Sequence, residues 1–453
     1  MRSVRVLVCS IMLLCSLAAG TAAADPPPAP GIPVPHPGFL PDLQQWIDQV
    51  LPSPVQPSGG TADPDAELAA LRAAVLPADV GDPMFDQWPK NLAEFAPGEI
   101  IEHRDIAATA APLTLVPLRS ATLLKFRTDD SQGRPSFATA TLLVPAADWT
   151  GPGDRPVLVN NLPIDALGRD CTPGYTLAHG LTLHSSMTEF IPPTTQLAAL
   201  RGYAVLVPDH EGPLMAYAEP YVAGHAVLDA IRATRGFDPA TFGASRFAMT
   251  GYSGGAIATH GAAKLIDSYA PELADAIVGA ALGGVPADFE ILSRSMNANL
   301  ASGIFMAATF AIGRERPEIL AAMNNLARWV ATSVMKDQCV SVFAIPGILH
   351  LPIDVAANIP DPLRSELATK IYEITRMSGL RSSTPLYIYN GEQEFWIPAE
   401  GARNLYDEQC SLGANAVYRS VFGEHVIGAV TGYPEAMLWL DERLQGVPAR
   451  SEC

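Results

Sequence analysis

The chain has 453 residues, of which 48% are hydrophobic and 17% are charged, and its formal net charge at pH 7 is −18. A chain of this length and composition can bury a sizeable core, either as one large domain with an insertion or as two domains. The acidic excess argues against nucleic acid or an anionic membrane surface as the main partner, because both repel negative charge.

The N-terminal residues have the pattern of a secretory signal peptide. Two arginines precede an apolar run from Val6 to Ala19, and the alanines at 22–24 match the small-residue cleavage pattern. We therefore expect residues 1–24 to be removed and the mature protein to be secreted. No later stretch reaches the roughly 18 continuous apolar residues of a membrane helix, so we expect no transmembrane segment.

The cysteine count adds a constraint on the exported chain. Two of the six cysteines lie in the predicted signal peptide, which leaves Cys171, Cys339, Cys410 and Cys453. An even number of cysteines in an exported protein implies two disulfides. Three pairings are possible, and the count alone does not choose among them.

Residues 25–82 form a proline-rich leader, whose first part we expect to be mobile because such sequence buries little. Within it only LQQWIDQVL and ELAALRAAVL have a helical pattern. After Pro97 the pattern changes, and the segments ATLLKFRT and FATATLLVP predict an antiparallel hairpin with Gly133 in its turn.

The following segments alternate between buried strands and helices. The strand patterns are PVLVNNLP, YAVLVPDHEG, RFAMTGY, AIVGAALGGVP, PLYIYNG and NAVYRSVFGEHV, and the clearest helical patterns cover 221–235 and 433–444. Such alternation predicts a mostly parallel α/β sheet flanked by helices. We expect this core in two parts, residues 83–287 and 381–453.

The stretch RFAMTGYSGGAIA carries the strongest chemical signal in the chain. A short apolar run leads into the G-Y-S-G-G sequence at 251–255, and a helical segment follows, which is the context of a nucleophile elbow. Glycines two residues either side of the serine let neighbouring backbones approach closely. Ser253 is therefore the predicted nucleophile, and the N–H group of Gly254 is the first predicted oxyanion donor.

A serine nucleophile requires a base and an acid. In α/β-hydrolases both follow the serine along the chain, first the acid and then the histidine that acts as the base. His425 is the predicted base, because it lies in a glycine-flanked turn after the last predicted strand. His350 falls inside the segment before the last strands, and His260 lies on the helix after the elbow, where packing explains it. Of Glu392 and Glu394, the frame GEQEFWIP favours Glu394 as the acid.

The second oxyanion donor should come from the loop after an earlier strand, because two donors must converge on the developing charge. The polar run PDHEG at 208–212 is the candidate. Whether a residue of this run would donate through its side chain or its backbone is open. An ionised carboxylate would oppose the oxyanion, so a donating side chain would have to be protonated.

Residues 288–380 form an insertion of apolar helical sequence between two predicted strands, far longer than a simple crossover. We expect it to be a helical cap over Ser253. Its large apolar residues can be read as ordinary core or, as a set, as the lining of an acyl pocket. They are Phe305, Met306, Phe310, Met323 and Trp329.

The chain resembles the secretory lipases of the lipase A type, from about Pro97 to Cys453. The motifs are PGEIIEHR, DCTPGYTL, VPDHEG, AGHAVLDAIRA, GYSGG with SYAPEL, GGVPAD, DQC, GEQEFWIP, DEQCSLGANA and GEHVIGA. The resemblance implies an α/β-hydrolase fold and a helical cap over an acyl tunnel. The residues it implies are the triad Ser253, Glu394 and His425, the oxyanion donors Asp209 and Gly254, and the disulfides Cys171–Cys339 and Cys410–Cys453. The family pattern has Asp at the acid position, where this chain has Glu394.

The residues and the resemblance together predict a secreted serine ester hydrolase, a triacylglycerol lipase or carboxylesterase, which forms an acyl-enzyme on Ser253. Its partners would be lipid or small ester substrates, with contact to a lipid surface. The alternatives are a lipid acyltransferase with the same triad and a non-catalytic, lipid-binding hydrolase scaffold. We expect no metal or other cofactor, because the sequence has no H-E-x-x-H, no close C-x-x-C pair and no phosphate-binding loop.

Overall fold

The computed structural model describes residues 39–55, 64–182, 185, 193–343 and 347–453. The predicted signal peptide and the first part of the predicted leader lie outside the described residues. All elements below belong to one unit, residues 36–453.

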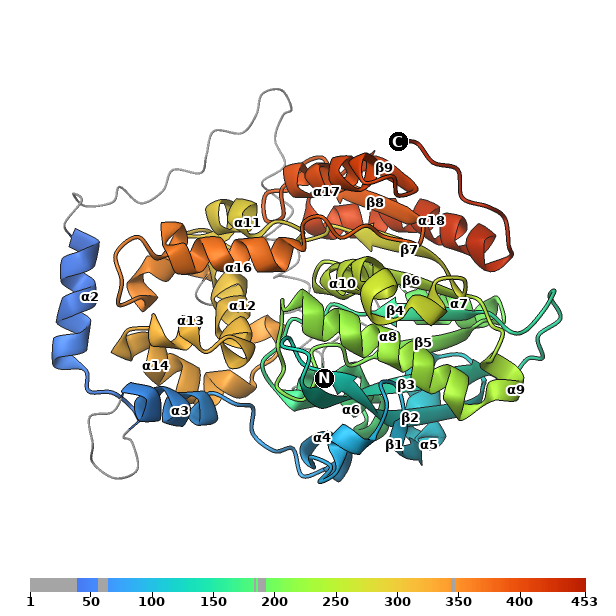
Figure 1. The fold of residues 1–453 in the computed structure, drawn as a ribbon, viewed down its shortest axis with the longest axis horizontal. Coiled ribbons are helices and arrows are strands. Elements are labelled where there is room, and N and C mark those ends of the chain that lie inside the picture. Colours follow the sequence, from blue (N-terminus) through green and yellow to red (C-terminus); the bar gives the residue numbers. More distant parts are fainter. Residues whose placement is uncertain (1–38, 56–63, 183–184, 186–192, 344–346) are drawn as a thin grey trace, which may run out of the picture. The chain divides into compact units, whose positions relative to one another are not determined.

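A mixed sheet forms the centre of this unit (Figure 1), with strand order β1-β2-β3-β5-β4-β6-β7-β8-β9 in the described residues. The pairs from β1 to β5 are antiparallel, and all pairs from β5 to β9 are parallel. The predicted hairpin and the mostly parallel sheet are thereby confirmed. The strands are β1 (Ile100–Asp105), β2 (Leu118–Asp129), β3 (Pro135–Pro145), β4 (Val157–Asn161), β5 (Ala204–Pro208), β6 (Phe247–Tyr252), β7 (Ile277–Gly283), β8 (Leu386–Gly391) and β9 (Ala416–Val421).

Helices cover both faces of the sheet, which explains why its central strands read as unbroken apolar runs. In β6, Phe247 and Met249 belong to the core on one face and Ala248 to the core on the other. The first core includes α8 (Pro220–Phe237), α10 (Gly254–Tyr269) and α17 (Ala399–Ser411). The second includes α4 (Pro83–Asp86), α5 (Ala107–Thr114), α6 (Pro173–His179), α7 (Thr194–Leu200) and α18 (His425–Leu444).

The segment between β7 and β8 is helical and packs around a third hydrophobic core, which also includes Tyr217 and Ile257 from outside the segment. Figure 1 shows its helices grouped to one side of the sheet. They are α11 (Phe289–Met296), α12 (Ser302–Glu315), α13 (Glu318–Ala321), α14 (Asn325–Thr332) and α16 (Glu366–Arg376). Two helices, α2 (Phe39–Val50) and α3 (Pro64–Ala74), form where the two helical patterns of the leader lie. Leu71 of α3 and Val75 are buried in the core of the inserted segment.

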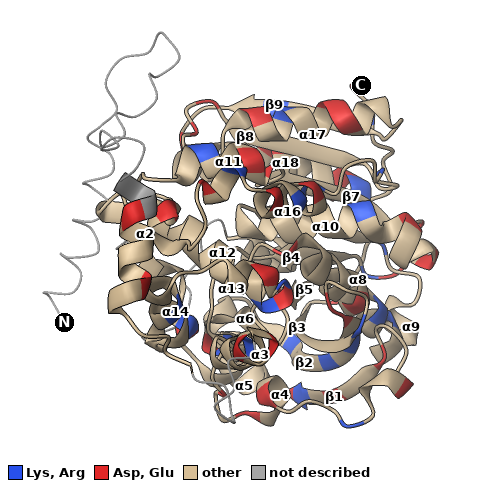
Figure 2. Cartoon of the chain, turned by 60° about the vertical axis from the view of Figure 1, so that its left-hand side comes forward, with Lys and Arg blue, Asp and Glu red and all other residues tan. Residues whose placement is uncertain are grey.

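Charged residues of both signs are spread over many elements rather than gathered in one (Figure 2). One ion pair closes the inserted segment at its base, because Arg376 at the end of α16 lies 2.9 Å from Asp288, the N-cap of α11. Among the described residues, no helix combines the length and the apolar character needed to cross a bilayer.

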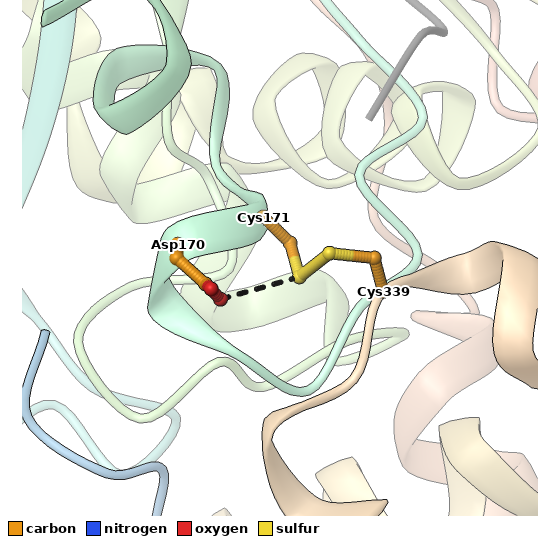
Figure 3. Close-up of side chains that lie close together, drawn as sticks. All are labelled: Asp170, Cys171 and Cys339. Carbon is orange, nitrogen blue, oxygen red and sulfur yellow. Dashed lines mark hydrogen bonds between the residues drawn. A yellow bond between two sulfur atoms is a disulfide. The ribbon is translucent and has the colours of Figure 1, made fainter. Parts of the chain in front are cut away.

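Two disulfides are present, Cys171–Cys339 and Cys410–Cys453, the same pairs that the resemblance implies. The first joins the loop before α6 to the inserted segment (Figure 3). Asp170 lies beside it, with Oδ1 3.6 Å from Sγ of Cys171. This trio has ligand types that metals favour, but its sulfur atoms are bonded to each other, so it offers no thiolate.

Candidate active site

Ser253 lies on a strained turn between β6 and α10. Its φ is 54°, a left-handed conformation that is costly for a residue with a side chain. The glycines around it are required by contact, since a Cβ atom at Gly251 would overlap the carbonyl of Gly255. A Cβ atom at Gly255 would overlap the carbonyl of Asn161. This is the geometry of a nucleophile elbow.

His425 is the first residue of α18, and its ring connects Ser253 to Glu394. Nε2 lies 3.0 Å from Oγ of Ser253, and Nδ1 lies 2.6 Å from Oε2 of Glu394. Because the carboxylate accepts a hydrogen bond from the Nδ1–H group, Nε2 is left without a proton and can accept the serine proton. The structure therefore brings together the serine, histidine and glutamate that the sequence analysis selected.

Glu394 is held in place by the turn after β8. Its side chain is fully buried, and Oε1 accepts hydrogen bonds from the N–H groups of Trp396 and Ile397. Glu392, two residues earlier, is exposed, with Oε1 3.3 Å from Oγ of Ser420. The turn thus separates the two glutamates and directs only Glu394 to the histidine.

The imidazole is also packed between aromatic rings. The hydroxyl group of Tyr252 donates a 2.6 Å hydrogen bond to the carbonyl of His425, and the two rings are 5.1 Å apart. The ring of Trp396 lies 5.4 Å from the imidazole on a tilted plane. By contrast, His260 is buried on α10, where burial lowers its pKa well below the ordinary value, as expected for a packed histidine.

The structure does not bring Asp209 to the serine. Its Oδ1 accepts a 2.8 Å hydrogen bond from the N–H of Gly174, its Oδ2 lies 2.5 Å from Oγ1 of Thr139, and it does not line the cavity that contains Ser253. The physical reason is the strand order β5-β4-β6. Because β4 lies between β5 and the elbow strand, the loop after β4 is closer to the serine than the loop after β5.

The loop after β4 carries Asp165, which the sequence analysis missed. Its carboxyl group lies against Gly254, where an added Cβ atom would overlap Oδ1. Asp165 is buried, its φ is 49°, and Oδ1 has no hydrogen-bond partner among the described residues. Burial raises the pKa of Asp165 to about 7, although the nearby His425 opposes the rise. The one available signal was an acidic residue within the apolar run NNLPIDAL.

A cavity of about 340 Å³ opens onto these residues. Ser253, His425 and Asp165 are part of its lining, and most of the rest is apolar. Of the five large residues singled out in the inserted segment, Phe305, Phe310 and Met323 line the cavity, whereas Met306 and Trp329 do not. A site of this kind suits an apolar chain attached to a reactive polar group.

A family model described as secretory lipase matches residues 183–452, more than half of the chain. The chain belongs to the secretory lipase family. The recognition made from the sequence motifs is thereby confirmed.

Named relatives extend over most of the chain. A probable inactive lipase of Mycobacterium tuberculosis is 29% identical and covers 85% of this chain and 86% of its own. A secreted triacylglycerol lipase of Malassezia globosa is 28% identical, and the match covers 80% of this chain and 79% of that protein. The crystal structure of Candida antarctica lipase A matches with a TM-score of 0.73 at 25% identity, and the match covers 84% of this chain and 89% of that one. These likenesses confirm that the chain has the α/β-hydrolase fold and that it is a carboxylic ester hydrolase.

Replacing Glu394 with glutamine should lower kcat by roughly 10³- to 10⁴-fold with little change in KM, because an amide no longer holds the imidazole in the useful tautomer. The measurement is hydrolysis of a soluble p-nitrophenyl ester. Glu392→Gln is the matched control in the same turn and should retain wild-type kcat. Equal losses in both variants would contradict the assignment of the acid.

Proposed function

We propose that the chain is a secreted lipase or carboxylesterase in which Ser253, His425 and Glu394 form the catalytic triad. The observation that carries this proposal is the continuous hydrogen-bonded chain from Glu394 through His425 to Ser253, at the wall of an apolar cavity. No other described serine has both an elbow turn and a histidine partner.

In the proposed reaction, Oγ of Ser253 attacks the ester carbonyl carbon while Nε2 of His425 takes the serine proton. The imidazolium then donates that proton to the leaving alkoxide as the carbon–oxygen bond breaks, and an acyl-enzyme remains. A water molecule, deprotonated by His425, attacks the acyl-enzyme. The imidazolium then returns the proton to Oγ of Ser253 as the bond between Oγ and the acyl carbon breaks, and the carboxylic acid is released. Glu394 keeps its hydrogen bond to Nδ1 and stabilises the imidazolium in both halves of the reaction.

Asp165 replaces Asp209 in the proposed oxyanion site. The N–H group of Gly254 follows the nucleophile directly, and the Asp165 carboxyl group lies against that glycine. A protonated carboxyl group donates an O–H hydrogen bond, whereas a carboxylate would repel the oxyanion. Because burial raises the pKa of Asp165 to about 7, the donor form is present in acidic solution and is lost as the pH rises through that value.

The cavity supports an acyl ester as the substrate class. Each methylene group buried in an apolar site contributes about 0.8 kcal/mol, so the lining favours substrates with an extended acyl chain. The inserted segment, residues 288–380, supplies much of that lining and is proposed as the cap. The Malassezia globosa relative is named as a triacylglycerol lipase, which supports lipid esters as substrates.

The non-catalytic alternative takes its support from the Mycobacterium tuberculosis relative, which is named as a probable inactive lipase. The triad of this chain argues for catalysis instead, because both of its hydrogen bonds are formed. Acyl transfer would use the same acyl-enzyme with an alcohol in place of water, and product analysis with a competing alcohol distinguishes it from hydrolysis.

We also propose secretion and contact with a lipid surface. The signal-like N-terminus, the two disulfides and a relative named as secreted support export. Four exposed apolar residues surround the start of α18 next to His425, namely Phe422, Val426, Ile427 and Val430. Their exposure suits contact with apolar material. The net charge of −18 favours an uncharged lipid surface over an anionic one.

Ser253→Ala should abolish turnover of p-nitrophenyl esters, and a fluorophosphonate probe should label the wild type at Ser253 but not this variant. Ser295→Ala, a change on α11, is the control and should retain labelling. Failure of the wild type to react with the probe would favour the non-catalytic scaffold.

For Asp165, kcat should fall as the pH rises through about 7, because the carboxyl group loses the proton that it donates. Asp165→Asn keeps a donor and should remove this alkaline fall, while Asp165→Ala should lower kcat roughly 10²- to 10³-fold at acidic pH. Asp209→Asn is the control and should keep the wild-type profile. Identical pH profiles for the wild type and Asp165→Asn would exclude the proposed role.

Phe422→Glu combined with Val430→Glu should reduce hydrolysis of emulsified triacylglycerol several-fold while hydrolysis of a soluble short-chain ester stays near wild type. The added charges make insertion into an apolar surface unfavourable. Leu438→Glu, also exposed but further along α18, is the matched control. Equal emulsion activity in all three proteins would remove these residues from lipid contact.

A further inference from the structure

Three consecutive side chains after β5 hold the loop that carries Asp165. Asp209 accepts a 2.8 Å hydrogen bond from the N–H of Gly174, and Nε2 of His210 donates a 2.8 Å bond to the carbonyl of Leu162. Oε1 of Glu211 accepts a 3.4 Å bond from the N–H of Ala166. The polar run PDHEG therefore contacts the neighbouring loop at its start and at its middle, and it also contacts the first turn of α6, which follows that loop.

The position of the Asp165 side chain depends on its backbone. Oδ1 has no hydrogen-bond partner in the described protein, so that oxygen is not fixed by a bond of its own. The backbone of Asp165 is left-handed, a conformation that persists only where the surroundings enforce it. Glu211 binds the N–H group of Ala166, the residue that follows Asp165.

Glu211 is suited to hold this amide without disturbing the donor. It is buried, and burial together with the charge of Asp165 raises its pKa well above the ordinary value, which favours the neutral form. A neutral carboxyl group still accepts the Ala166 hydrogen bond. Arg314, whose charge opposes this rise in the pKa of Glu211, directs its guanidinium to backbone carbonyls, including those of Leu167 and Met215.

We propose that Glu211 is a positioning residue for ester hydrolysis: it holds the Ala166 amide so that the Asp165 carboxyl group stays against Gly254, where the oxyanion forms. This inference rests on the proposed function and on Asp165 as an oxyanion donor. Glu211 itself does not line the cavity and so acts through Asp165.

The simpler reading is that Glu211 only stabilises the fold. The two roles differ in their effect on kinetics. Loss of oxyanion stabilisation lowers kcat without changing KM, because the oxyanion exists only in the transition state and the intermediate. Loss of stability alone lowers the amount of folded enzyme and leaves kcat per active site unchanged.

The test is a double-mutant cycle with the full-length enzyme and a soluble short-chain p-nitrophenyl ester, with active sites counted by fluorophosphonate titration. Glu211→Gln keeps the acceptor and should retain kcat near wild type. Glu211→Met removes the acceptor at similar length, and it should lower kcat tenfold to roughly a hundredfold at constant KM, as expected for displacement of a catalytic group by about 1 Å. In an Asp165→Ala background, Glu211→Met should cost nothing further.

Where Glu211→Met does not fold, Glu211→Asp replaces it, because this change withdraws the acceptor by one methylene group and keeps the site polar. A loss of kcat of equal size in the wild-type and Asp165→Ala backgrounds would overturn the positioning role and leave the triad proposal intact. An Asp165→Ala enzyme with wild-type kcat would instead overturn the oxyanion assignment itself.

Discussion

The buried hydrogen bond between Glu394 and Nδ1 of His425 is the interaction on which the rest of the site depends. The carboxylate is removed from solvent and is held by two backbone N–H groups, so it can neither rotate away nor be replaced by water. It fixes which imidazole nitrogen faces Ser253. The imidazole of His425 therefore has one defined orientation. The strained turn at Ser253 places the hydroxyl group against that ring, and the aromatic side chains pack around it.

The order of strands decides which loops can reach that serine. Chain order places the PDHEG loop, after β5, nearest to the elbow in sequence, yet β4 occupies the place beside β6. The acidic residue that lies against Gly254, Asp165, therefore comes from the loop after β4. The loop after β5 lies one strand further from β6. Its polar side chains bind the backbone of the loop after β4 and of the first turn of α6.

Much of this molecule could be predicted from the sequence. The sequence could select Ser253, Glu394 and His425 as a candidate triad because each lies in a short local pattern of glycines or at a strand end. Such local patterns can be recognised without knowledge of the tertiary structure. Asp165 has no such pattern, since its place beside Gly254 depends on β4 lying between β5 and β6. The cavity lining shows the same limit: Phe305 and Met306 are adjacent in sequence, but only Phe305 faces the cavity.

The covalent link between Cys171 and Cys339 has a consequence for how substrate gains access. It fastens the middle of the inserted segment to the loop that follows Asp165, while the ion pair of Arg376 with Asp288 closes the base of that segment. The segment cannot swing away as one rigid body about its base. Widening of the cavity must therefore come from bending among the helices of the inserted segment that are distant from Cys339. The cavity wall close to the disulfide then keeps its position while those helices move.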